Sequence, residues 1–173
     1  MARRAEAKGV AIVVEVVLGA EEVVHVDASK GMTEWAKENM HLSKLDDKFI
    51  RFIVDDCLKF VEREARRGRK YDAIIMDPPS YGRGPNGEVW KFEHNLDKLI
   101  KACMNILSDN PLFFLINSYT TGISSTVLYN ILKTSMNKYE GTIDAGEIGL
   151  SITNNDLVLP CGIYGKITKN VKR

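Results

Sequence analysis

The sequence has little of what marks membrane, metal-bound or disulfide-linked proteins. Its most apolar early run, Val10 to Leu18, is about half as long as the roughly 20 residues of a membrane helix, and it contains Glu15. Its three cysteines, Cys57, Cys103 and Cys161, are far apart, which argues against a disulfide framework and against a zinc site. We therefore expect a soluble protein with free thiols, no bound metal and, by default, a cytoplasmic location.

The sequence also lacks an excess of charge of either sign. Lys and Arg number 24 and Asp and Glu 23, so the net charge of +1 gives no evidence for a nucleic-acid partner. Two local basic patches remain, Arg63 to Lys70 and Lys166 to Arg173. Each is a candidate nucleic-acid contact, and the commoner alternative is a solvated helix end for the first and a frayed terminus for the second.

The order of apolar segments indicates an α/β protein. A chain of 173 residues with 45% hydrophobic content can bury one core, so we expect a single domain over residues 1–173. Short apolar runs alternate with amphipathic stretches, which predicts a three-layer fold with helices on both faces of a sheet. Strands are expected at 22–26, 49–54, 73–76 and 112–116, with a closing antiparallel pair at 141–145 and 158–167. Helices are expected at 29–40, 58–67, 92–107 and 126–137, and a loop at 80–87.

Acidic residues follow three of the predicted strands. Ligands of open α/β sheets bind outside the carboxyl ends of the strands, which is where these residues are expected to lie. Asp27 could accept hydrogen bonds from both hydroxyls of a ribose, and Asp55 or Asp56 could accept one from an adenine amino group. The alternative for each is that the carboxylate only caps the helix that follows.

The third acid, Asp77, is followed by Pro78 and Pro79. Two consecutive prolines remove two backbone donors and hold the chain extended, so the turn presents its carbonyls and the Asp77 carboxylate in a fixed direction. Such acceptors can orient an amino group or a nucleobase edge for attack on a methyl sulfonium. The alternative is a simple turn that ends a strand.

Taken in order, these motifs resemble the S-adenosylmethionine-dependent methyltransferases that act on large-subunit ribosomal RNA. The resemblance covers nearly the whole chain from Gly9 onward. The segments that carry it are Asp27 to Lys30, Trp35-Ala36 with Asn39, Ile53 to Asp56, Tyr71 to Gly84, Gly87 to Lys91 and Leu159 to Gly162. It implies a Rossmann-like methyltransferase sheet, mostly parallel, with an antiparallel C-terminal hairpin.

The resemblance also implies a cofactor, a substrate and a set of site residues. The cofactor would be S-adenosyl-L-methionine, and the partner an RNA substrate, ribosomal RNA by the same likeness. Asp77 would lie beside the reactive centre, and a base flipped out of the RNA could stack on Tyr81. The implied catalytic residues are Asp77, Pro78, Ser80 and Tyr81. The implied cofactor-binding residues are Gly9, Asp27, Ala28, Ser29, Asp55, Asp56, Cys57 and Asp77. Among them, Asp27 would bind the ribose, and Asp56 with the Cys57 backbone would hold the adenine.

The start of the chain departs from the family pattern. The first strand and the glycine-rich turn of the family are missing, with Gly9 as the last trace of that turn. The run Val10 to Leu18 matches the family's first helix; the alternative is a strand that fills the gap between the strands ending at Asp27 and Asp77. We expect the helix. With either structure, three alternatives stay open for the chain: a fragment of a longer enzyme, a mis-started reading frame or a degenerate copy.

The loops around the predicted site bear on the chemistry. Carbon-5 methylation of pyrimidines needs a cysteine nucleophile near the cofactor, and the segments 77–80 and 117–120 contain none, so we disfavour it. A nucleotide-dependent oxidoreductase is disfavoured because no Gly-x-Gly-x-x-Gly follows a strand. Two alternatives stay open, an active methyltransferase and a non-catalytic module that kept the fold but binds cofactor weakly or not at all.

Overall fold

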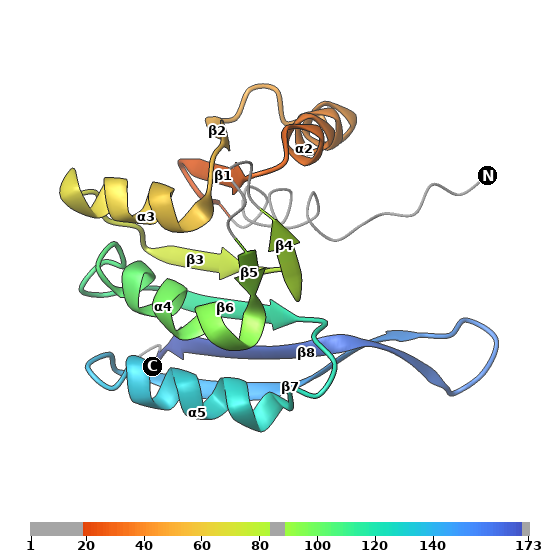
Figure 1. Ribbon diagram of the computed structural model, residues 1–173. Helices are drawn as coiled ribbons and strands as arrows, with labels where there is room; N and C mark the ends of the chain where they lie inside the picture. The colour runs from red at the N-terminus through yellow and green to blue at the C-terminus, as the bar shows by residue number, and fades with distance from the viewer. Residues whose placement is uncertain (1–18, 84–88, 171–173) are drawn as a thin grey trace. The chain divides into compact units, whose positions relative to one another are not determined.

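A computed structural model describes residues 19–83 and 89–170 of the chain (Figure 1). The chain divides into two compact units, Met1–Phe60 and Val61–Arg173, and each is described by itself. The single domain expected over the whole chain stays a prediction. The predictions for Gly9 and for Val10 to Leu18 lie outside the described residues. No helix in the described ranges is long and apolar enough to cross a membrane.

The first unit is a β-α-β arrangement. Strand β1 (Val23–Asp27) leads through helix α2 (Lys30–Leu42) to strand β2 (Ile50–Val54), which pairs with β1 in parallel. Helix α2 begins as predicted, because the Ser29 side chain accepts a hydrogen bond from the Met32 amide at 3.4 Å, which is the N-cap geometry. Helix α3 (Cys57–Arg66) then leads out of this unit.

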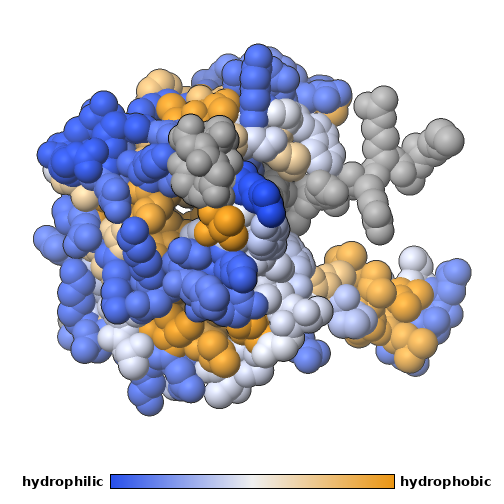
Figure 2. Space-filling view, viewed as in Figure 1, coloured by the Kyte–Doolittle hydropathy of each residue, from blue (hydrophilic) through white to orange (hydrophobic). Residues whose placement is uncertain are grey.

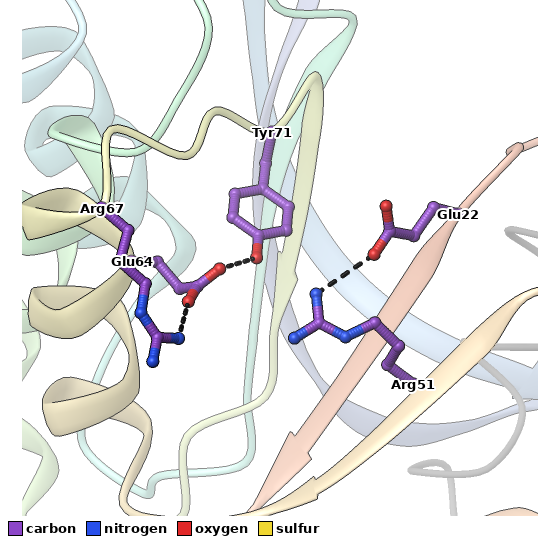
Figure 3. Close-up of polar contacts among 5 residues, drawn as sticks. All are labelled: Glu22, Arg51, Glu64, Arg67 and Tyr71. Carbon is purple, nitrogen blue, oxygen red and sulfur yellow. Dashed lines mark hydrogen bonds and ion pairs between the residues drawn. The ribbon is translucent and has the colours of Figure 1, made fainter.

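A small apolar cluster holds the first unit together. Val23 and Ala36 are buried with Leu45, and Met40, Ile50 and Phe52 pack against them. On the surface of the two strands, the Arg51 guanidinium forms an ion pair with Glu22 at 3.2 Å (Figure 3). The core residues come from both strands and from α2, so the helix covers the sheet that it connects.

The second unit is built on a four-stranded sheet in the order β3-β6-β8-β7 (Figure 1). Its first two strands are parallel, and β8 lies antiparallel between β6 and β7. The strands are β3 (Ala73–Met76), β6 (Phe113–Ser118), β7 (Gly141–Ser151) and β8 (Val158–Lys169). The helices are the last residues of α3, then α4 (Phe92–Met104) and α5 (Ser125–Ser135). The predicted antiparallel closing pair is confirmed.

Helices α4 and α5 supply much of the core of this unit. Leu96, Leu99, Ile100 and Cys103 are buried on α4, as their helical spacing predicts. Helix α5 buries Leu128 and Leu132, and it approaches β8 at Gly165, where a Cβ atom would lie 2.8 Å from the Leu128 Cβ. Glycine is therefore required there for the helix to pack on the strand.

A buried carboxylate joins α3 to the start of β3. Glu64 is 1% exposed and accepts a hydrogen bond from the Tyr71 hydroxyl at 2.8 Å and one from the Arg67 guanidinium at 3.0 Å (Figure 3). Buried carboxylates are tolerated when both oxygens are satisfied in this way. Gly68, with φ of 67°, ends the helix between them, as its position predicts.

The loop predicted at 80–87 is wrong at residues 81–83, which form a strand. Strand β4 (Tyr81–Arg83) pairs antiparallel with β5 (Val89–Lys91), and Gly82 lies opposite Trp90. The Gly and Pro residues that suggested a loop fall mostly between these strands, whose aromatic and β-branched residues favour pairing. Among the described residues, the strands of the two units form separate hydrogen-bonded sheets, and none pairs with both β1 and β3.

Strands β7 and β8 continue as a two-stranded ribbon beyond the rest of the sheet. Pairing between β6 and β8 ends at Ser118 opposite Ile163, whereas β7 runs to Ser151, six residues past its predicted end. The register shifts between Ile148 and Gly149, where Cys161 is an extra residue on β8. Every residue from 149 to 160 is exposed. We call this segment the β7–β8 arm; it extends past the end of β6 in Figure 1.

Candidate functional site

Two of the predicted acids lie side by side at the carboxyl edge of the β1–β2 sheet. Asp27 ends β1 opposite Val54, and the Asp55 amide donates to the Asp27 carbonyl at 3.2 Å. One carboxylate oxygen of Asp27 also accepts from the Ser29 amide at 2.7 Å, which turns the chain into α2. Asp27 is half-buried, whereas Ala28 and Ser29 are exposed. The strand edge therefore presents two carboxylates where the sequence predicts them.

Asp56 has a structural task in addition to the predicted one. Its carboxylate accepts from the Lys59 amide at 2.9 Å, two residues into α3, so Asp56 is the N-cap of that helix. Its own amide donates to the Asp55 side chain at 2.8 Å. The exposed Cys57 thiol lies 3.7 Å from the Val26 carbonyl. The capping alternative thus holds for Asp56.

The turn from Asp77 to Ser80 follows β3 and is fixed by contacts from distant parts of the chain. The Trp90 indole donates to the Pro79 carbonyl at 2.6 Å, and the Phe92 amide donates to the Ser80 carbonyl at 3.1 Å. The Thr120 hydroxyl donates to the Ser80 hydroxyl at 2.9 Å. Since Pro78 is buried and Asp77 half-buried, the turn is anchored on one side and open on the other.

Tyr81 offers an exposed aromatic ring beside this turn. It exposes 51% of its surface, and its hydroxyl accepts a hydrogen bond from the Arg83 guanidinium at 2.8 Å. Pairing of Tyr81 with Lys91 fixes the backbone beneath it. The ring is therefore held at both ends while its face stays accessible.

A second tyrosine, Tyr119, is electrostatically coupled to Asp77. Partial burial raises the pKa of Tyr119, and Coulomb interactions with Asp77 and Cys161 raise that pKa further. Tyr119 follows β6, the strand next to β3, and Cys161 is brought up from β8, where its thiol lies 3.3 Å from the Leu159 carbonyl. Tyr119 is thus a neutral phenol at physiological pH, close to the candidate reactive acid.

Sequence reasoning found the acids and missed the groups that surround them. Trp90, Tyr119 with Thr120, and Cys161 come from three segments that pairing and packing bring to the turn. Only the pairing of 81–83 with 89–91 had a local signal, the alternation of Val89-Trp90-Lys91. The prediction that no cysteine lies near this turn rested on residues 77–80 and 117–120 alone, whereas Cys161 approaches Tyr119 from β8.

The described residues of the two basic patches do not lie at this edge of the second unit. Arg63 to Lys70 precedes β3, so it lies toward the amino end of the strand that carries Asp77 at its carboxyl end. Within it, Arg67 pairs with Glu64, and the Lys70 ammonium donates to the Asn105 carbonyl at 3.1 Å. In the second patch Lys166 pairs with Asp144 at 3.2 Å, and residues 171–173 lie outside the described ranges.

Comparison with known proteins supports the fold and the sequence motifs. No protein-family model matches the chain. The chain is 38% identical over 96 residues, 56% of its length, to ribosomal RNA large subunit methyltransferase I of Tolumonas auensis. It is 32% identical over 136 residues, 74% of its length, to the protein of the same name from an Enterobacter species. It spans 21% and 30% of the lengths of these two relatives.

The structural comparison decides the fold. The SAM-dependent methyltransferase of Agrobacterium tumefaciens matches 94% of this chain with a TM-score of 0.86 and 36% sequence identity, over 53% of its own length. The fold is that of the S-adenosylmethionine-dependent methyltransferases. The α/β fold class and the resemblance to this type of methyltransferase are therefore confirmed.

The methyltransferase fold alone does not decide the substrate. The ribosomal protein L11 methylase of Lactobacillus delbrueckii also matches 94% of the chain, over 66% of its own length, with a TM-score of 0.52 and 18% identity. That likeness supports the fold and nothing further, since one fold accommodates many substrates. The substrate must be argued from the site and from the more similar relatives.

Proposed function

We propose that the chain transfers a methyl group from S-adenosyl-L-methionine to RNA, with ribosomal RNA as the substrate. The observation that carries the proposal is the pair of carboxylates, Asp27 and Asp55, at the carboxyl edge of the β1–β2 sheet. The same chain carries the Asp77-Pro78-Pro79 turn directly after strand β3. The names of the relatives, rRNA methyltransferases at 32% and 38% identity, favour RNA over other substrates.

The residues of the first unit fit the adenosine part of this cofactor. A ribose has two neighbouring hydroxyl donors, and a carboxylate has two oxygens with about four acceptor sites, of which Asp27 uses one for the Ser29 amide. Asp55 lies next to it and could accept from the adenine amino group. In this role Asp56 shapes the edge by starting α3, and the exposed Cys57 backbone borders the base.

The residues of the second unit fit the substrate. The bound cofactor supplies an electrophilic methyl group on a sulfonium. Asp77 would orient the attacking group and accept its proton, while the Pro79 carbonyl is already occupied by Trp90. Tyr81 would stack on an unpaired base, because its exposed ring is held by Arg83. A cytoplasmic location stays the expectation from the sequence.

A calorimetric titration with S-adenosylmethionine tests the proposal. The parent chain is expected to bind, and Asp27→Asn is expected to weaken binding about tenfold or more, since Asn offers one acceptor oxygen in place of two. Asp27→Asn still accepts from the Ser29 amide, so the fold is preserved. The matched control is Asp47→Asn, an exposed acid of the same unit whose pairing is with Lys48 on the surface.

The outcome separates the two functions left open. No heat at high cofactor concentration would refute the active enzyme and favour a non-catalytic module that kept the fold. Binding that Asp27→Asn and Asp47→Asn reduce equally would refute the assignment of the ribose to Asp27. Transfer of a labelled methyl group to ribosomal RNA, and not to ribosomal protein, is the expected result for the substrate.

A further inference from the structure

Tyr119 lies beside the turn after β3, and its neighbours in the chain hold it there. Ser118 before it and Thr120 after it are both buried, and the Thr120 hydroxyl donates to the Ser80 hydroxyl at 2.9 Å. The Thr120 amide also donates to the Ser118 hydroxyl at 3.2 Å. Tyr119 itself exposes 46% of its surface. The fold therefore fixes the backbone of this tyrosine next to the turn and leaves its side chain accessible.

A glycine of β8 makes room for the ring of Tyr119. A Cβ atom at Gly162 would lie 2.6 Å from the Ser118 carbonyl oxygen and 2.9 Å from the Tyr119 Cδ1 atom. The φ of Gly162 is 140°, a value that side chains rarely adopt. One edge of the ring is thus packed against the main chain of β8, which fixes the direction of the phenol.

The surface at Tyr119 differs from that of the β7–β8 arm. In the arm Leu150 pairs with Leu159. The Ile152 amide donates to the Leu157 carbonyl at 3.0 Å, so these two aliphatic pairs share one side of the ribbon. The arm shows the orange of apolar residues at the lower right of Figure 2. The surface at Tyr119 carries a phenol, a hydroxyl and a carboxylate instead, so it suits a planar polar ligand.

The turn beside Tyr119 is rich in acceptors, whereas the phenol is a donor. Pro78 and Pro79 have no backbone N–H, and the Asp77 carboxylate accepts hydrogen bonds. Tyr119 keeps its proton at physiological pH, because burial and the Coulomb interaction with Asp77 raise its pKa. Strands β3 and β6 are parallel neighbours, so the acceptor and the donor follow them at the same edge of the sheet.

We propose that Asp77 and Tyr119 read the Watson–Crick edge of adenine or cytosine, and that the exocyclic amino nitrogen of this base receives the methyl group. The inference rests on the proposed function. In both bases an amino donor lies next to a ring nitrogen that accepts. Asp77 accepts from the amino group, and the Tyr119 hydroxyl donates to the ring nitrogen. Uracil and hypoxanthine present a keto oxygen and an N–H in these places, which opposes like to like.

The transfer step needs no covalent bond to the enzyme. The amino nitrogen uses its lone pair to bond to the methyl carbon, while the bond from that carbon to the sulfonium sulfur breaks and leaves its electron pair on the sulfur. The methylated nitrogen then loses one proton to the Asp77 carboxylate. This agrees with segments 77–80 and 117–120, which contain no cysteine nucleophile. The Cys161 thiol, whose proton is directed at the Leu159 carbonyl, takes no part.

Binding of short RNA strands tests the reading of the base without any methyl transfer. The probes are oligouridine strands that carry one adenosine, one cytidine or one inosine at the centre. Inosine differs from adenosine by a keto oxygen and an N–H in place of the amino group and the ring acceptor. Fluorescence anisotropy is expected to show the adenosine or the cytidine strand binding about 25-fold more tightly than the inosine strand, about fivefold for each of two hydrogen bonds.

Two tyrosine variants separate the phenol from the ring. Tyr119→Phe keeps the ring on Gly162 and removes the donor, so it should lower the preference over inosine about fivefold. Tyr129→Phe removes the hydroxyl of a half-buried tyrosine on α5 and is the matched control, which should keep the preference of the parent. A loss of folding would weaken all strands alike, so the ratio of affinities reports the contact itself.

Nucleoside analysis identifies the methylated atom. An unmodified transcript of large-subunit ribosomal RNA is incubated with labelled S-adenosylmethionine and digested, and mass spectrometry locates the label. The expected product is adenosine or cytidine with the methyl group on the exocyclic nitrogen. Cys161→Ser should give the same product in a similar yield, because the thiol takes no part.

Three results would overturn the inference. One is equal affinity for the adenosine, cytidine and inosine strands. Another is an equal fall of the preference in Tyr119→Phe and Tyr129→Phe, which would remove the phenol from the base. The third is a methyl group on carbon 5 of a pyrimidine that is lost in Cys161→Ser, which would assign the chemistry to the thiol. Absence of label from RNA would instead overturn the proposed function, and the binding ratios would still decide how the base is read.

Discussion

The carboxylates at the β1–β2 edge and the turn after β3 are held by different kinds of contact. Asp27, Asp55 and Asp56 each bond to an amide one to three residues further along the chain. The turn at Pro79 and Ser80 is held instead by Trp90, 11 residues away, and by Thr120, 40 residues away. The first site is built from local geometry and the second from tertiary packing.

This difference has a consequence for substitutions. Local bonds form wherever the strand ends and the helix begins, so changes elsewhere in the chain should leave the first site intact. The second site depends on several segments that must all be in place, so a change in any of them should alter the position of Asp77 and with it the rate of methyl transfer. The variants below test this contrast.

The largest effect is expected for Asp77→Asn. Loss of the carboxylate removes a general base and an orienting acceptor, so methyl transfer should fall by about 100-fold or more while cofactor affinity changes little. Labelled methyl transfer and calorimetry measure the two quantities. Asp72→Asn, an exposed acid just before the same strand, is the matched control. An equal loss of affinity and activity in Asp77→Asn would contradict the separation of the two sites.

A smaller effect is expected for Trp90→Phe. The substitution keeps an aromatic ring but removes the hydrogen bond to the Pro79 carbonyl, which is worth about 1 kcal/mol. If that bond positions the turn, kcat should fall about fivefold with the KM for RNA nearly unchanged. Trp35→Phe in α2 changes the other tryptophan and should leave kcat as it is. A kcat of Trp90→Phe equal to that of Trp35→Phe would show that the turn holds its shape without the indole.

At the first site, Asp56 separates capping from binding. Asp56→Ala should lower the free energy of unfolding by about 1 kcal/mol, because the Lys59 amide loses its acceptor. Asp56→Ser retains a capping oxygen and should recover most of that stability in urea unfolding. If Asp56 contacts the adenine, Asp56→Ser should still bind cofactor more weakly than the parent. Affinity that follows stability in both variants would limit Asp56 to its capping role.

The smallest effect is expected in the titration of Tyr119. Its raised pKa means that its contribution to stability is fully present below about pH 10 and is lost as the pH rises through the pKa of the folded state. Asp77→Asn should lower this pKa only part of the way, because burial is the larger cause. Ultraviolet titration against Tyr119→Phe measures it. Tyr164, whose pKa is raised by its hydrogen bond to Asp144, should not respond to Asp77→Asn.

The same contrast explains what could be predicted from the sequence. The end of β1 and the start of α2 were found because Ser29 and Asp27 make bonds within three residues. The predicted bounds of strand β3, 73–76, are confirmed, since Pro78 ends the strand. The buried positions of α4 followed from their spacing. In each case the signal and the structure it specifies lie in the same few residues.

What could not be predicted depends on pairing between distant segments. Strand β4 is three residues long and exists only because β5 pairs with it. The indole of Trp90 reaches Pro79 only once that pairing has formed. The length of β7 beyond its predicted end is set by β8, and its register by one extra residue. A stretch with weak local preference takes its structure from its partner, which a single sequence does not identify.

The extra residue at Cys161 has a further consequence for the arm. If β8 continued in the register that pairs Ile143 with Ile167, Leu150 would lie opposite Pro160 and Ile152 opposite Val158. Leu157 and Leu159 would then point away from Leu150, Ile152 and Val158, giving a ribbon with three aliphatic side chains on one side and two on the other. Deleting one residue of β8 would thus replace a ribbon that is apolar mainly on one side by a ribbon that is apolar on both sides. The gathering of four aliphatic side chains on one side of the arm thus depends on one extra residue in β8.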